Sequence, residues 1–165
     1  MVTQDVDKAR TRLIRATTRA IAGARLERSR IQEIADRAPR LLEGEVHEVI
    51  NLTGQPDNDL DYYAYELARL QDVARTTIKV FGSPQEVVDA LAEFDAAVPN
   101  LRMARNPLTH PSDDDRLDDV GWMSALVRFG NGGAVEYLVD PRYDHHDAAE
   151  RLAQSLLGYL RAGLR

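Results

Sequence analysis

The residues best suited to chemistry in this chain are gathered in one hexapeptide, RNPLTH at residues 105–110. The guanidinium of Arg105 is a permanent cation that can hold a phosphate through two parallel hydrogen bonds. The imidazole of His110, with an ordinary pKa of about 6.5, can donate or accept a proton at neutral pH. Cleavage of a phosphodiester without a metal needs such a pair, because a base must take the proton of the attacking 2′-hydroxyl and a cation must stabilise the transition state.

The place of Arg105 in the apolar pattern also indicates a site. Apolar residues recur at alternating spacings of four and three in the series Val87, Leu91, Phe94, Val98 and Leu101. Arg105 is the next member of this series, so a guanidinium falls on the face that should be buried. An unpaired buried cation costs several kcal/mol. We therefore expect Arg105 to lie beside a partner, a water-filled cleft or an incoming anion.

A plainer interpretation of the hexapeptide is structural. Arg105 could pair with one of the nearby carboxylates, while His110 is a polar residue at a helix end. The candidate carboxylates are Asp113, Asp114 and Asp115. Five residues of α-helix set two side chains about 140° apart, a gap that a long arginine can lean across. Spacing alone leaves both interpretations open.

The composition is that of one soluble globular domain. Of 165 residues, 44% are hydrophobic and 29% are charged, so we expect a single domain over residues 1–165 with its own core. There is no cysteine, which excludes disulfides and thiolate metal sites. The apolar runs are too short to cross a bilayer, and MVTQDVDKAR at 1–10 lacks the apolar core of a signal peptide. We expect a cytoplasmic protein that does not enter membranes.

Charge is distributed unevenly along the chain. Lys and Arg total 21 against 27 Asp and Glu, a formal net charge of −6, which disfavours generic nucleic-acid binding. Residues 8–40, however, contain ten basic and three acidic residues, whereas residues 113–119 contain five aspartates. The basic third could serve a polyanion, a partner protein or a self-complementary dimer, or it could be a solvated helix face.

Helical periodicity covers most of the chain. Apolar residues at helical spacing predict a first helix over 6–38, stopped by a proline, and a shorter one over 42–50. The composition of residues 52–58 is typical of a loop. The next apolar stripe predicts a helix over 63–81 that Gly82 ends.

The strongest local signal is SPQE at 83–86, which combines an N-cap serine, a proline at the first helical position and a glutamate in the first turn. It predicts a helix over 83–98 capped by Ser83. Pro99 should bend or restart that helix, and a second short helical piece should carry the chain to Arg105.

The sequence period then changes from 3.6 to 2. Two alternating runs joined by a glycine-rich loop at 130–133 predict an antiparallel hairpin at about 122–139. The last helix should begin near Asp144 and bury a stripe from Ala148 to Leu160. The expected fold class is therefore mainly α, a helical bundle with one β-hairpin before the C-terminal helix.

A metal or cofactor site is not indicated by the sequence. DHHD at 144–147 looks at first like a metal cluster, but adjacent residues at a helix start point about 100° apart, and Asp144 is more simply an N-cap. The acidic run at 113–119 lacks the glycine and the terminal glutamate of an EF-hand loop. A nucleophile elbow, a phosphate loop, a His-Glu-x-x-His motif and a dinucleotide fingerprint are all missing. We expect no metal and no cofactor.

The hexapeptide resembles the motif of the HEPN superfamily, helical domains marked by an arginine, a polar residue just after it and a histidine a few positions on. Arg105, Asn106 and His110 match this pattern, while Pro107 and the hairpin depart from it. The resemblance implies a four-helix-type bundle that forms a homodimer with the motif at the interface. Active members are metal-independent ribonucleases, often toxins or defence proteins, and others are non-catalytic binding modules.

The leading hypothesis is a HEPN-like ribonuclease in which His110 is the acid or base, Arg105 the phosphate clamp and Asn106 the residue that orients one of them. Its partners would be a second copy of the chain, RNA, and an antitoxin or regulatory protein. One alternative is a non-catalytic regulatory or protein-interaction module whose Arg105 and His110 hold a dimer together through aspartate contacts. Another is a small-ligand sensor with its pocket between bundle and hairpin.

Overall fold

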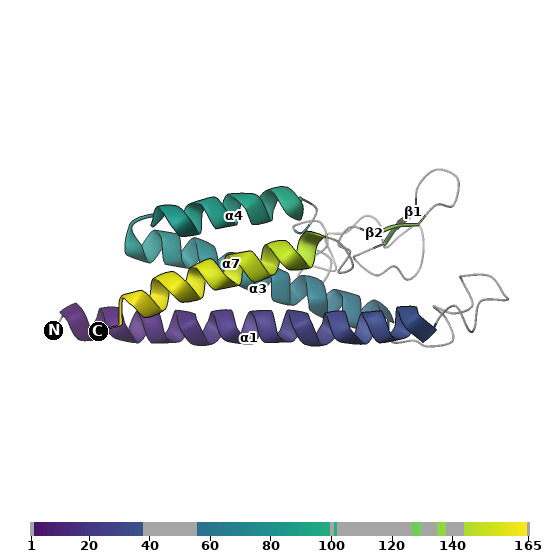
Figure 1. Cartoon of the computed structure of the whole chain (residues 1–165), viewed down its shortest axis with the longest axis horizontal. Coiled ribbons are helices and arrows are strands. Elements are labelled where there is room, and N and C mark those ends of the chain that lie inside the picture. Colours follow the sequence, from purple (N-terminus) through teal and green to yellow (C-terminus); the bar gives the residue numbers. More distant parts are fainter. Residues whose placement is uncertain are drawn as a thin grey trace, which may run out of the picture.

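The computed structural model is mainly helical, as the periodicity predicts (Figure 1). It describes residues 2–37, 56–99, 101, 127–129, 135–137 and 144–164. The helices in these ranges are α1 (Val2–Arg37), α3 (Pro56–Phe81), α4 (Gln85–Ala97) and α7 (Asp144–Ala162). None of these described helices is both long enough and apolar enough to cross a membrane.

The helices form a bundle with α1 along one side. α3 and α7 pack against α1, and α4 packs against α3 and α7 on the side away from α1 (Figure 1). The end of α7 lies near the start of α1, whereas the end of α4 and the start of α7 lie side by side farther along the bundle, where α1 and α3 extend beyond them (Figure 1). Segments that are far apart in the sequence therefore lie close together at both places.

The core lies where the four helices meet. The stripe predicted on α3 is buried, and its residues face apolar residues of α4 and α7. Each large apolar side chain that is fully buried stabilises the fold by about 1.5–3 kcal/mol. The largest fully buried side chains are Tyr63, Phe94, Leu67, Leu70, Leu101, Leu152, Leu156, Leu160, Val87 and Thr17.

Small residues allow α3 to approach α1 closely. Ala20 and Ala24 of α1 are both 1% exposed. Gly23 lies beside Glu66 of α3, and a Cβ at position 23 would stand 2.7 Å from the Glu66 Cγ. The close approach at this crossing therefore requires glycine, because a methyl group would force the Glu66 side chain to move.

Arg10, near the start of α1, contacts the C-terminal ends of α7 and α3. Its guanidinium donates to the carbonyl oxygens of Tyr159 at 3.3 Å and Leu160 at 3.5 Å. It also lies 4.5 Å above the centroid of the Phe81 ring and 5.2 Å from that of Tyr159. The last carbonyls of a helix lack partners within the helix, so a cation there satisfies them and favours the negative end of the dipole. A Cβ at Gly163 would overlap this guanidinium.

The predicted cap of α4 is wrong. Ser83 has φ 60°, and its N–H donates to the carbonyl of Ile78 at 2.9 Å, which closes the end of α3. Gly82, with φ 77°, is the left-handed residue before it, so Gly82 ends α3 as predicted. α4 begins at Gln85, and Pro84 is its N-cap without a side-chain bond. Only two residues separate Gly82 from the start of α4, and the backbone of Ser83 takes part in closing the end of α3.

Two further boundaries can be compared with the sequence predictions. The loop expected at 52–58 is wrong for residues 56–58, because α3 begins at Pro56. Proline suits the first helical position, where its missing N–H would have no partner. The first helix is confirmed as far as Arg37, where the described part of α1 ends. The helix expected at 42–50 lies outside the described residues.

Two short strands lie within the predicted hairpin. β1 (Val127–Phe129) and β2 (Val135–Tyr137) pair antiparallel, with Arg128 opposite Glu136. The remainder of 122–139, including the glycine-rich loop, lies outside the described residues. The hairpin at its full predicted extent therefore stays a prediction.

Candidate functional site

The predicted catalytic residues lie in a segment that the structure does not describe. Arg105, Asn106 and His110 are all outside the described residues, and so are the aspartates at 113–115. The last described residue before the motif is Leu101, which is 2% exposed in the core. The pairing expected for Arg105 is thus untested, and its roles remain predictions.

A different polar cluster crosses three of the described helices. The hydroxyl of Tyr63 on α3 lies 3.3 Å from Nδ1 of His146 on α7. On the other side of the ring, His146 Nε2 lies 3.3 Å from Oε1 of Glu150. Glu150 in turn accepts two hydrogen bonds from Arg25 of α1, from Nε to Oε1 and from Nη2 to Oε2, both at 2.6 Å. Tyr63, His146, Glu150 and Arg25 therefore form one polar chain from α3 to α1.

The partners of His146 define its protonation. An ionised carboxylate can only accept, so Nε2 of His146 must carry the hydrogen that points to Glu150. Nδ1 of a neutral ring is then an acceptor, which suits the hydroxyl of Tyr63 as a donor. A neutral imidazole with its hydrogen on Nε2 satisfies both contacts at once.

The electrostatic surroundings agree with this assignment. Burial is the largest cause that lowers the pKa of His146, the cation of Arg28 lowers it further, and Glu150 and Asp147 oppose them. Hydrogen bonds from Arg25 are the largest cause that lowers the pKa of Glu150. At neutral pH the pair is therefore a neutral imidazole beside an ionised carboxylate.

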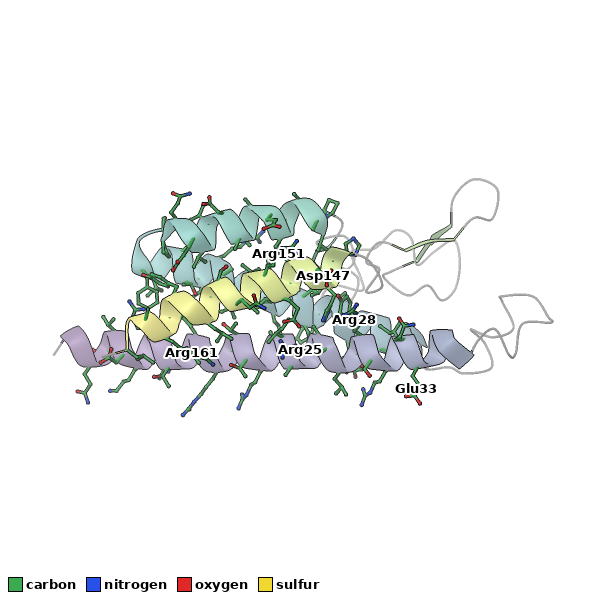
Figure 2. All side chains as sticks on the ribbon, in the orientation of Figure 1. Arg25, Arg28, Glu33, Asp147, Arg151 and Arg161 are labelled. Atoms are coloured by element: carbon green, nitrogen blue, oxygen red, sulfur yellow. The ribbon has the colours of Figure 1, made fainter. Side chains whose placement is uncertain are left out.

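A pocket of about 650 Å³ opens beside this polar chain. Figure 2 shows Arg25 and Arg28 on the part of α1 that lies beside α7, and Asp147 near the start of α7. Glu33 points away from α7 in the same view (Figure 2). The described residues that line the pocket are Arg25, Arg28, Ser29, Gln32, Glu33, His146 and Glu150.

Sequence reasoning missed the importance of His146. The expectation that no histidine–acid pair lies at i, i+4 spacing with the cluster at 144–147 is wrong, because Glu150 follows His146 by four residues and so lies on the same face of the helix. His146 also precedes the buried Ala149 by three residues and Ala153 by seven. This spacing places an imidazole on the apolar face, which is the signal that could have identified it.

The pocket offers hydrogen-bond donors and cations rather than a metal cage. Within the described ranges no three His, Cys, Asp or Glu side chains are grouped so that they could hold a metal ion. A guanidinium with the hydroxyl of Ser29 and the amide of Gln32 can bind an anionic or polar ligand. Comparisons of this chain with protein-family models, curated proteins and solved structures found no match.

Proposed function

We propose that this chain is a HEPN-like protein that cleaves RNA without a metal. The observation that carries the proposal is the motif of Arg105, Asn106 and His110 in a mainly helical chain. The proposal also includes a HEPN-like fold and a homodimer with the motif at its interface.

Each motif residue has one role in the proposed reaction. His110 takes the proton of the RNA 2′-hydroxyl, and the resulting oxygen attacks the adjacent phosphorus. The bond from phosphorus to the 5′-oxygen breaks, and that oxygen takes up a proton from water while His110 returns its proton to the solvent, which gives a 2′,3′-cyclic phosphate and a 5′-hydroxyl. Arg105 neutralises the non-bridging oxygens in the transition state, and Asn106 orients one of the two side chains.

The described bundle supports the proposal in two ways. The motif starts four residues after the buried Leu101, a length of chain that reaches at most about 14 Å. Leu101 follows α4, whose end lies beside the start of α7 (Figure 1). The pocket beside the start of α7 is lined by Arg28 as well as by the Arg25–Glu150 pair, so a cation other than Arg105 is available to the phosphates of a long substrate.

Cleavage by the full chain in the presence of a chelator tests the proposal. Wild-type protein should cleave a labelled RNA in EDTA, because the proposed step needs only a base and a cation. His110→Ala should lower the rate by about 10²–10⁴, the effect typical of losing a general acid or base. The matched control is His47→Ala, which removes another imidazole of the chain and should leave the rate unchanged.

The result of the cleavage assay distinguishes a ribonuclease from a non-catalytic module. Equal cleavage by wild type and His110→Ala would identify a contaminating nuclease. No cleavage of any RNA by wild type would favour the second candidate, a regulatory or interaction module in which Arg105 is paired with a carboxylate. Arg105→Leu then discriminates further, because apolar packing can replace a structural ion pair at little cost but cannot replace a phosphate clamp.

A further inference from the structure

The outer face of α1 carries a row of basic residues. Successive positions on an α-helix are about 100° apart, which places five cations within about 60° of one another on this helix. All five are exposed, and Arg30 lies at the border with α3, 3.9 Å from Asp59. The basic face consists of Lys8, Arg12, Arg15, Arg19 and Arg30.

Three of the five cations of the basic face have no carboxylate partner within the described ranges. Glu27 is the one acidic residue between positions 8 and 30, and it is 7% exposed. Lys8 pairs with Asp5 at 3.9 Å, and Arg30 pairs with Glu27 at 3.1 Å. Arg12, Arg15 and Arg19, which lie on adjoining turns of α1, have no ion pair with any residue in the described ranges. A net-acidic protein therefore presents a concentrated positive strip.

One exposed aromatic side chain, Tyr62 of α3, borders this face. Gly23 lies against Glu66, and Arg30 lies 3.9 Å from Asp59, so the α1 and α3 helices run antiparallel along this junction. Tyr62 of α3 stands between these two contacts and is 60% exposed. It is level with Leu26 of α1, an apolar residue on the basic face that is 50% exposed. Surfaces that bind single-stranded nucleic acids combine two elements: a row of cations along the sugar–phosphate backbone and an exposed aromatic ring on which a base can stack.

We propose that the basic face of α1, together with Tyr62, binds the backbone and one base of the single-stranded RNA on which this protein acts. The choice of RNA rests on the proposed function, whereas the binding surface rests on the described side chains. Phosphates lie along Arg12, Arg15 and Arg19, and an unstacked base lies on the ring of Tyr62. Duplex RNA fits less well because its bases are already stacked and cannot reach the ring.

The test measures binding of a fluorescein-labelled single-stranded RNA by fluorescence anisotropy. The protein is the full chain, and all samples carry His110→Ala so that the RNA is not cleaved. The first variant adds Arg12→Gln, Arg15→Gln and Arg19→Gln, which keep helix propensity and remove three charges. The charge-matched control adds Arg75→Gln, Lys79→Gln and Arg151→Gln. These are exposed cations of α3 and α7, and two of them pair with residues of α4, away from α1.

The α1 variant should bind at least about tenfold more weakly than the control at low salt. The slope of log affinity against log salt should become shallower by about 2, because each phosphate contact on a single strand contributes about 0.7. Tyr62→Ser should weaken binding about tenfold, whereas Val80→Ser, which changes another exposed apolar residue of α3, should not. Circular dichroism should show the same helix content in all variants.

Equal affinities of the α1 variant and its control would overturn the proposal. Equal binding of duplex and single-stranded RNA, with no effect of Tyr62→Ser, would overturn the single-strand assignment. Failure of the proposed cleavage is a separate result, because RNA binding that depends on the α1 arginines but occurs without cleavage would keep the binding surface and reject the ribonuclease. If a protein with native His110 cleaves RNA at the same rate with and without the α1 substitutions, the ribonuclease would be kept and the binding surface rejected.

Discussion

The imidazole of His146 is buried between a phenol and a carboxylate, and this burial favours its neutral form. His146 is 3% exposed, and both of its ring nitrogens have partners, Tyr63 and Glu150. The neutral form fits both contacts, and burial, followed by the nearby cation of Arg28, disfavours the protonated ring. The chemistry of this residue is thus a result of three helices meeting around it.

Acidification should destabilise the protein in a window set by His146. Its pKa is lowered from 6.5, so the folded state binds fewer protons than the unfolded state between the two pKa values, and the free energy of unfolding rises with pH there. This contribution is complete above about pH 6.5 and is lost as the pH falls toward the folded pKa. Glu150, whose pKa is lowered from 4.5, adds a second loss at more acidic pH.

Urea denaturation of wild type and His146→Gln across this pH range measures the effect. The variant lacks the titrating ring, so its free energy of unfolding should fall less steeply between pH 6.5 and the folded pKa of His146. At higher pH the variant should be less stable than wild type, because Gln does not reproduce both contacts of the ring. Identical pH slopes for the two proteins would reject this role for His146.

At the scale of elements, the connection between α3 and α4 depends on backbone conformations that most residues disfavour. Gly82 has φ 77° and Ser83 has φ 60°, and the N–H of Ser83 closes the end of α3 on Ile78. The left-handed region is open to glycine and is unfavourable for side chains with a Cβ. The turn therefore fixes where α3 ends and how soon α4 can begin.

Gly82→Ala should lower the free energy of unfolding by about 1–2 kcal/mol, because alanine is strained at this φ even though a Cβ would meet no other atom there. The matched control is Gly158→Ala, in the middle of α7, where a Cβ also meets open space. That substitution should stabilise by up to about 1 kcal/mol through helix propensity. Denaturant titration gives both values, and a loss of stability in both variants would show that the conformation of Gly82 is not the cause.

At the scale of the whole molecule, the four described helices share one core. Leu67 of α3, Phe94 of α4 and Leu152 of α7 are each 0% exposed within the same cluster. Arg10 joins the start of α1 to the end of α7 through two carbonyl groups and the Tyr159 ring, and to the end of α3 through the Phe81 ring. Loss of packing at one helix should therefore weaken the others as well.

Leu152→Ala should destabilise the protein by about 2–5 kcal/mol, the range for deleting a fully buried leucine side chain. Val80→Ala, at a position that is 53% exposed, should change the stability by less than about 0.5 kcal/mol. Thermal unfolding followed by far-ultraviolet circular dichroism checks both. A partial loss of helix in Leu152→Ala, followed by a second transition at the wild-type temperature, would contradict a shared core.

The sequence by itself determined the helices and their buried faces, because a period near 3.6 depends only on local geometry and on which side chains avoid water. The first helix, the stripe from Tyr63 onward, the end of α3 at Gly82 and the start of the last helix near Asp144 were predicted in this way and are confirmed. The N-cap of α4 was predicted wrongly. Ser83 could either cap the start of α4 or close the end of α3, and its hydrogen bond to Ile78 selects the second role.

Tertiary structure alone decided which polar residues come together. Arg25 and Glu150 are separated by 125 residues and Tyr63 and His146 by 83, so no local pattern could join them into a chain. Only the i, i+4 relation of His146 to Glu150 was visible in the sequence. The packing of α7 against α1 and α3 removes water from the imidazole, and that burial is the largest cause of its lowered pKa.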